Sequence, residues 1–196
     1  MTESGPDLAR DIDAIVIGAS AGGIEALLAI SAVLPPRFAP AVLIVLHLPP
    51  DRRSELAPLL AGRCVLPVGE ALDKQPVAGG TVVVAPPDYH LLVEPTRTLA
   101  LSCDPPVLFS RPAIDPLFET AATVWRERLL AILLTGASND GSAGVAAVRR
   151  HGGNAWVQRP SDAREPTMPA AAVRHAGADA ILTLQQICSR LAAAGA

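Results

Sequence analysis

The chain has 196 residues, which is enough for one sizeable α/β core, and its length favours a single domain. Half of the residues are hydrophobic and only 18% are charged, which excludes a disordered chain. The formal net charge of −3 provides no basic surface for nucleic acid or anionic lipid, so we expect neither as a partner.

Residues 1–12 are polar and acidic, and we expect them to form a disordered lead to a domain that spans residues 13–196. This lead lacks the apolar segment of a signal peptide. No apolar run reaches the length of a membrane span, so the sequence predicts a cytoplasmic protein without membrane insertion. The cysteines at positions 64, 103 and 188 match neither a C-x-x-C motif nor a zinc-binding spacing, which predicts free thiols.

The first part of the domain alternates between strands and helices. The apolar run Ala14–Gly18 predicts a strand that is buried on both faces, and a helix is expected over residues 22–33. A second buried strand is expected over residues 41–46, and a helix over residues 54–62 follows it. Strands alternating with helices in this way are typical of a parallel sheet.

The middle of the chain has a different pattern. The β-branched residues at 81–85 predict another strand, which ends at the turn Pro86-Pro87-Asp88. Residues 90–94 and 98–102 then predict the two strands of an antiparallel hairpin, which is an insert in the alternating pattern.

The alternation resumes in the second half of the chain. The expected elements are a helix over 115–128, a strand over 129–134, a helix over 143–150, a strand over 155–158, a helix over 169–175, a strand over 180–182 and a last helix from 184. The whole pattern predicts an α/β fold with a doubly wound, mostly parallel sheet, Rossmann-like and three-layered, with the antiparallel hairpin as an insert.

Ser20 lies in the glycine-rich segment Gly18–Gly23, directly after the first expected strand. As a G-x-S-x-G motif, this segment is a strained strand-to-helix turn that exposes a nucleophilic hydroxyl. As a dinucleotide-binding motif with Ser20 in place of the middle glycine, it is a phosphate site at a helix N-terminus. The dinucleotide interpretation also predicts an acidic residue at the end of the second strand, where the sequence has His47 instead.

Reactive side chains follow three of the expected strands: Ser20 after the first, His47 after the second and Asp140 after the strand over 129–134. Ligands of open parallel sheets bind at the carboxyl ends of the strands, where these residues would converge. A serine hydroxyl needs a base to take its proton, and a carboxylate orients the imidazole that does so. The three residues together favour a Ser-His-Asp triad.

Each of these residues also has a simpler interpretation. Ser20 could cap the helix that follows it, because serine is a preferred N-cap residue. His47 could be a hydrogen-bonded histidine at the edge of the sheet, and Asp140 could be a turn residue within Asn139-Asp140-Gly141.

Other polar residues are weaker candidates. His90, at the start of the hairpin, is a candidate for the rim of the site or for packing, and Arg111 is a candidate to bind a carboxylate or carbonyl, or an exposed side chain. His151 and His175 lie at expected helix ends, where a cation interacts favourably with the helix dipole. The sequence contains no cluster with the spacing of metal ligands.

The chain resembles the catalytic domain of CheB-type protein-glutamate methylesterases of bacterial chemotaxis. The matching segments occur in the family's order from about residue 13 to 190: 17–27, 45–50, 84–90, 105–107, 111–115, 133–136, 139–141 and 168–169.

The resemblance implies a serine esterase that removes methyl groups from methylated glutamates on chemoreceptors and deamidates certain glutamines. It assigns the triad to Ser20, His47 and Asp140, and a backbone amide such as that of Ala21 would hold the oxyanion. It implies no cofactor and a methylated receptor or signalling protein as substrate. Members that act in chemotaxis commonly carry an N-terminal receiver domain, whereas only about a dozen residues precede the first expected strand here. The chain is therefore expected to be a stand-alone esterase, or a fragment or partner of a larger system with a separate receiver or signalling partner.

The sequence departs from the family in loops that are expected to line the cleft. Ala21 and Ala137 replace a hydroxyl residue and a methionine, Leu108-Phe109-Ser110 replaces a polar and basic segment, and Thr167 replaces a glycine. Two alternatives therefore remain: a non-catalytic binding module with the same fold, and an esterase that acts on another protein or on a small-molecule ester.

Overall fold

The computed structural model describes residues 8, 11–49 and 54–194. Seven strands form one sheet in the order β3-β4-β2-β1-β7-β8-β9, and every neighbouring pair is parallel. The strands are β1 (Ala14–Ala19), β2 (Ala41–Leu46), β3 (Val68–Glu70), β4 (Val82–Val84), β7 (Leu129–Leu133), β8 (Asn154–Gln158) and β9 (Ala180–Leu182). A separate antiparallel hairpin consists of β5 (His90–Val93) and β6 (Leu99–Ser102).

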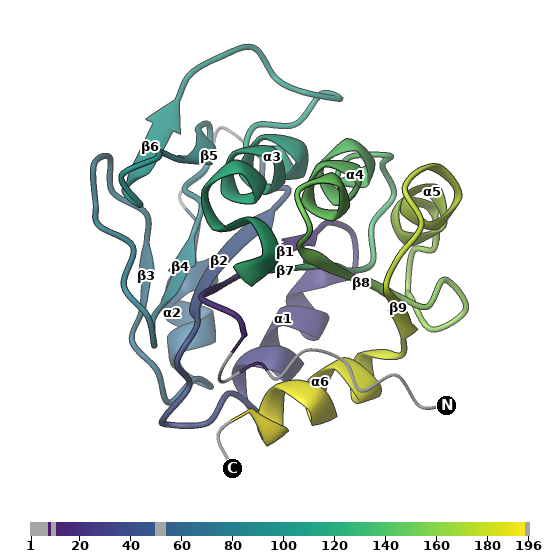
Figure 1. Cartoon of the computed structure of the whole chain (residues 1–196), viewed down its shortest axis with the longest axis horizontal. Helices are drawn as coiled ribbons and strands as arrows, with labels where there is room; N and C mark the ends of the chain where they lie inside the picture. The colour runs from purple at the N-terminus through teal and green to yellow at the C-terminus, as the bar shows by residue number, and fades with distance from the viewer. Residues whose placement is uncertain (1–7, 9–10, 50–53, 195–196) are drawn as a thin grey trace.

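Helices cover both faces of the sheet, so the molecule has three layers (Figure 1). One face carries α1 (Gly23–Ser31), α2 (Leu56–Ala61) and α6 (Leu184–Ala193). The other carries α3 (Ile114–Trp125), with the short 3-10 turn η1 (Arg126–Arg128) after it, α4 (Ser142–Arg150) and α5 (Thr167–His175). The hairpin packs beside α3 at the same face.

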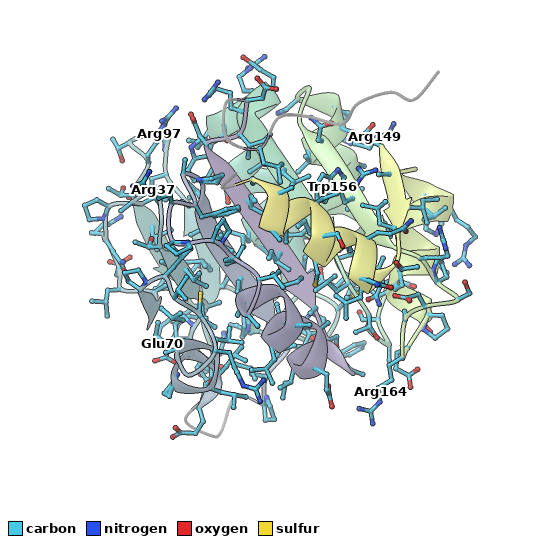
Figure 2. The ribbon with its side chains drawn as sticks, turned by 90° about the horizontal axis from the view of Figure 1, so that it is seen from below. Arg37, Glu70, Arg97, Arg149, Trp156 and Arg164 are labelled. Atoms are coloured by element: carbon cyan, nitrogen blue, oxygen red, sulfur yellow. The ribbon has the colours of Figure 1, made fainter. Side chains whose placement is uncertain are left out.

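The central strands are apolar along their whole length because both of their faces are covered. Every residue of β1, β2 and β7 is buried. Alternate side chains therefore enter opposite cores: Ile15 and Ile17 of β1 pack under α1 and α6, whereas Ala14 and Val16 pack under α3. Figure 2 views the first of these faces, where α1 and α6 lie across the sheet and Trp156 of β8 lies beneath α6.

The strand order reverses at β1. The helix that follows β1, α1, covers one face of the sheet, whereas the helix that follows β7, α4, covers the other. The pairing register aligns the carboxyl ends of these strands, with Ala19 opposite Leu46 of β2 and Gly18 opposite Leu133 of β7. Such a switch point is where open α/β sheets bind their ligands. The residues that follow β1, β2 and β7 therefore meet at one place.

The predicted α/β fold is confirmed, including the parallel sheet and the antiparallel hairpin. The strand β3 was not predicted, because it has only three residues and none of them is buried. The expected lead at residues 1–12 lies mostly outside the described residues, and its boundary stays a prediction; the described Leu8 and Ile12 are buried in the core. Within the described part of the chain, no helix is both long and apolar enough to cross a membrane.

Candidate active site

The turn after β1 places Ser20 directly before the first turn of α1. Gly22 adopts a left-handed conformation with φ of 77°, and the amide of Gly23 donates to the Ser20 carbonyl over 2.8 Å. This conformation favours glycine, and a Cβ at Gly22 would also lie 2.8 Å from the Arg164 side chain. Among the described residues, the amides of Ala21 and Gly22 find no acceptor, so their N–H groups are available at the start of the helix.

His47 and Asp140 are joined by a hydrogen bond of 2.7 Å between His47 Nε2 and Asp140 Oδ2. The Asp140 side chain is fully buried, whereas 12% of the His47 side chain is exposed to solvent. The bond to Nε2 leaves Nδ1 as the ring nitrogen that is free to act on another group. The structure thus brings together two of the three residues predicted from strand ends.

Four donors surround the Asp140 carboxylate. Oδ2 accepts from His47 and from the amide of Ile114 (2.6 Å), and Oδ1 accepts from the amides of Asp115 (3.0 Å) and Gly141 (2.8 Å). Burial alone would raise the pKa of Asp140, but the hydrogen bonds from His47, Ile114 and Asp115 outweigh it and lower that pKa below its usual value. Asp140 is therefore a carboxylate that orients His47.

Ser20 and His47 line the same cleft, which has a volume of about 430 Å³. Within the described residues, no hydrogen bond joins the Ser20 hydroxyl to His47; hydrogen bonds of this kind are often long in unliganded hydrolases. Arg164 and Glu165 form part of the same lining, and Figure 2 shows Arg164 projecting at the edge of the molecule. Arg164 also pairs with Glu25 of α1 over 3.2 Å.

The loop after β7 is hydrogen-bonded to the turn that contains Ser20. The Thr135 carbonyl accepts from the amide of Ser20 over 3.0 Å, and its hydroxyl donates to the carbonyl of Ala21 over 2.9 Å. The same hydroxyl accepts from the amide of Glu165 over 2.8 Å. The Gln158 side chain accepts from the amide of Thr135, so three loops are tied together behind Ser20.

Gly136 allows the β7 loop to approach Ser20 closely. A Cβ at this position would lie 2.5 Å from Met168 Cε and 2.9 Å from Ser20 Cβ. Gly136 is also fixed by its backbone, because its amide donates to Glu165 and its carbonyl accepts from Met168. Met168 is fully buried, so Gly136 is packed between Met168 and the turn that contains Ser20.

Two of the weaker candidates, His90 and Arg111, bind groups of the protein itself. His90 is buried, with Nδ1 accepting from the amide of Ala113 and Nε2 donating to the carbonyl of Pro105. Arg111 does bind a carboxylate and carbonyls, but they belong to the protein: Asp88 and the backbone of residues 103 and 104. His151 and His175 lie at the ends of α4 and α5, away from the cleft lining.

Sequence reasoning did not single out Asp115 or Thr135. Burial and the neighbouring charge of Asp140 raise the pKa of Asp115 to about 7, which is a common property of functional sites. An acidic residue at the start of a helix after the Arg111-Pro112 segment was the available signal for Asp115. Throughout the described residues, no group of three or more His, Cys, Asp or Glu side chains is placed to hold a metal ion.

Comparison with known proteins identifies the family of this chain. The family model described as CheB methylesterase matches residues 15–191. A relative from Leptospira interrogans is 41% identical over 175 residues, covering 89% of this chain and 91% of the relative. The protein-glutamate methylesterase/protein-glutamine glutaminase of Symbiobacterium thermophilum is 37% identical over 177 residues. The match covers 49% of that relative's length, so this chain spans about half of it.

A solved structure shows the same fold. The crystal structure of the Thermotoga maritima CheB methylesterase catalytic domain superposes with a TM-score of 0.87 and 30% sequence identity, over 93% of this chain and 98% of that one. The fold and these relatives thus define a carboxylic ester hydrolase of the α/β class. The chain belongs to the CheB methylesterase family. None of these comparisons supports the alternative of a non-catalytic module.

Proposed function

We propose that this CheB-family protein hydrolyses the methyl esters of methylated glutamates on chemoreceptor-like proteins, with Ser20, His47 and Asp140 as its catalytic triad. The observation that carries the proposal is the hydrogen bond of 2.7 Å between His47 and Asp140 at the edge of the cleft that Ser20 lines. A base fixed by a buried carboxylate next to a serine in a strand-to-helix turn is the arrangement that serine hydrolases use.

In the proposed mechanism, His47 takes the proton of the Ser20 hydroxyl through Nδ1, because Nε2 is engaged by Asp140. Ser20 Oγ attacks the ester carbonyl, and the amides of Ala21 and Gly22, which have no acceptor among the described residues, stabilise the oxyanion. His47 returns the proton to the leaving methoxide, so methanol departs and a glutamyl-serine ester forms. Water activated by His47 then hydrolyses this ester and restores Ser20. No cofactor takes part in these steps.

The names of the relatives support the substrate and a second activity. The homologues from Symbiobacterium and Caulobacter vibrioides are both named protein-glutamate methylesterase/protein-glutamine glutaminase. Attack on a side-chain amide by the same serine would release ammonia in place of methanol, so glutamine deamidation belongs to the same proposal. The proposal also includes a methylated receptor or signalling protein as substrate, a separate receiver or signalling partner, and a cytoplasmic location.

The experiment that tests the proposal measures methanol release from a methylated chemoreceptor fragment by the wild-type protein and by Ser20→Ala. We expect release by the wild-type protein alone, and a fluorophosphonate probe should label wild type at Ser20. Equal methanol release from both proteins would show that Ser20 is not the nucleophile. A folded wild-type protein that neither releases methanol nor reacts with the probe would contradict esterase activity.

A further inference from the structure

A second carboxyl group lies directly behind the His47–Asp140 pair, and the mechanism above leaves it unused. Asp115 is the second residue of α3, and its side chain is mostly buried against α4. Its backbone amide donates to Asp140 Oδ1 over 3.0 Å, and burial together with the neighbouring charge of Asp140 raises the pKa of its side chain. Neighbouring carboxyl groups in a buried site compete for one proton, because both cannot ionise without strong repulsion.

The surroundings of the two groups decide which of them keeps the proton. Asp140 accepts from four donors, including the imidazole of His47. The Asp115 side chain accepts from one, the amide of Gly144 over 2.6 Å. Glu119 faces Asp115 from the same helix with a like charge, and no described cation forms an ion pair with Asp115. Asp140 therefore ionises first, and the proton belongs on Asp115.

The packing of α3 against α4 holds Asp115 in this position. A Cβ at Gly144 would lie 2.5 Å from Phe118 Cβ and 3.1 Å from Asp115 Oδ1, so the glycine is what lets the two helices approach. Asp115 thereby contacts the first turn of α4 through its carboxyl group and the carboxylate that orients His47 through its backbone amide. Its position is set by two rigid elements and does not depend on a mobile loop.

We propose that Asp115 is a positioning residue for the triad: in its protonated form it donates a hydrogen bond to the Asp140 carboxylate while accepting from Gly144, and its ionisation switches the site to a less active state. This inference rests on the proposed function, because it assigns a role in that same reaction. Ionised Asp115 sets a second negative charge against Asp140. In this form Asp115 can no longer donate to Asp140 and repels it, so the carboxylate that orients His47 loses a fixed partner and His47 takes the Ser20 proton less readily.

The raised pKa of Asp115, about 7, places this switch near neutral pH. The variant Asp115→Asn tests it, because the amide has the same shape, accepts from Gly144, donates to Asp140 and cannot ionise. We expect kcat of Asp115→Asn to stay within about twofold of wild type at pH 6.5. Between pH 6.5 and 8.5 wild-type kcat should fall by roughly fivefold relative to that of Asp115→Asn.

The matched variant Asp115→Leu fills the same space without hydrogen bonds, and its kcat should fall by about tenfold or more at every pH with its KM little changed. Identical pH profiles for wild type and Asp115→Asn would overturn the proposal. So would full activity of Asp115→Leu, or a large loss of activity in folded Asp115→Asn, which would require the carboxylate form.

A spectroscopic measurement keeps the test separate from the proposed function. The His47 ring protons, followed by NMR as pH is varied, should respond to the ionisation of Asp115 in the wild-type protein, and this response should be lost in Asp115→Asn. This readout requires no turnover. Absence of the difference would refute the coupling, whereas methanol release by Ser20→Ala would refute the assigned nucleophile and leave the coupling measurable.

Discussion

The hydroxyl of Thr135 donates a hydrogen bond to the carbonyl of Ala21, which joins the end of β7 to the turn that contains Ser20. The same oxygen accepts from the amide of Glu165, a residue that lines the cleft. One buried side chain thus fixes the relative positions of three loops. We therefore expect the position of Ser20 relative to His47 to depend on Thr135, which is not among the residues that line the cleft.

Thr135→Val should destabilise the fold and impair catalysis together. Valine keeps the shape of threonine but leaves the Glu165 amide and the Ala21 carbonyl without their partner, which costs about 1–3 kcal/mol of unfolding free energy. Urea unfolding and kcat for methyl ester hydrolysis check the two effects. Thr135→Ser keeps the hydroxyl and serves as the control; if it loses as much kcat as Thr135→Val, the hydrogen bonds are not responsible.

Asp140→Asn should lower kcat far more than it lowers stability. The amide cannot accept all four hydrogen bonds, and it favours the wrong tautomer of His47, an effect worth roughly 10³–10⁴ in kcat in serine hydrolases with this triad. Steady-state kinetics with a methyl ester substrate measure the loss. The exposed Asp104→Asn is the control and should behave as wild type. A loss of less than about tenfold in Asp140→Asn would argue against the triad.

Gly136→Ala should disturb the serine turn with a modest effect on the fold. The new methyl group would meet the flexible end of Met168, which can move, and Ser20 Cβ, which is held by the turn. We expect labelling of Ser20 by a fluorophosphonate to slow by about tenfold or more, because a displacement of the nucleophile by a fraction of an ångström is costly. Gly69→Ala, where a Cβ meets nothing within 4 Å, is the control and should label at the wild-type rate.

Asp115 should make the protein less stable as pH rises from about 4 to about 7. Its pKa in the folded protein, about 7, exceeds its ordinary value of 3.8, so over this interval the folded state binds more protons than the unfolded state. Asp115→Asn removes this effect, and its melting temperature relative to wild type should therefore increase from pH 4 to pH 8. A difference that is constant with pH would show that the folded and unfolded states bind this proton equally.

Arg111→Lys should increase local opening of the loop that contains the exposed side chain of Phe109. Phe109 is fully exposed, and the guanidinium of Arg111 anchors this loop to Asp88 and to the carbonyls of residues 103 and 104. Lysine cannot make these contacts together, so chymotrypsin should cleave after Phe109 roughly fivefold faster through local opening. Arg149→Lys removes a comparable anchor elsewhere and should leave this cleavage unchanged.

The buried framework was predictable from the sequence because each central strand is a continuous apolar run. Ala41–Leu46 was predicted with its observed bounds, and the hairpin was predicted from β-branched and apolar segments around a turn. The edge strand β3 escaped prediction because Val68-Gly69-Glu70 is short and lacks a buried face. Its position follows from pairing with β4, which no local pattern encodes.

For the candidate site, the sequence allowed one residue to be predicted in the segment that follows each of the three central strands. Topology alone brings Ser20, His47 and Asp140 to one edge of the sheet. The proximity of Asp115 to Asp140 could not be predicted, because it depends on the distance between α3 and α4. These helices approach closely because Gly144 has no side chain. The finer geometry of the site is therefore a property of tertiary packing.

The strands β2 and β7 do not pair with each other; each pairs with β1, which lies between them. His47 and Asp140, 93 positions apart, consequently meet only after β1 has acquired a neighbour on both sides. During synthesis we expect no esterase activity until the segment that contains Asp140 has left the ribosome. During refolding we expect the hydrogen bond to form only with the non-local contacts, which close slowly. Ester cleavage by a refolding sample would therefore time the completion of the three central strands.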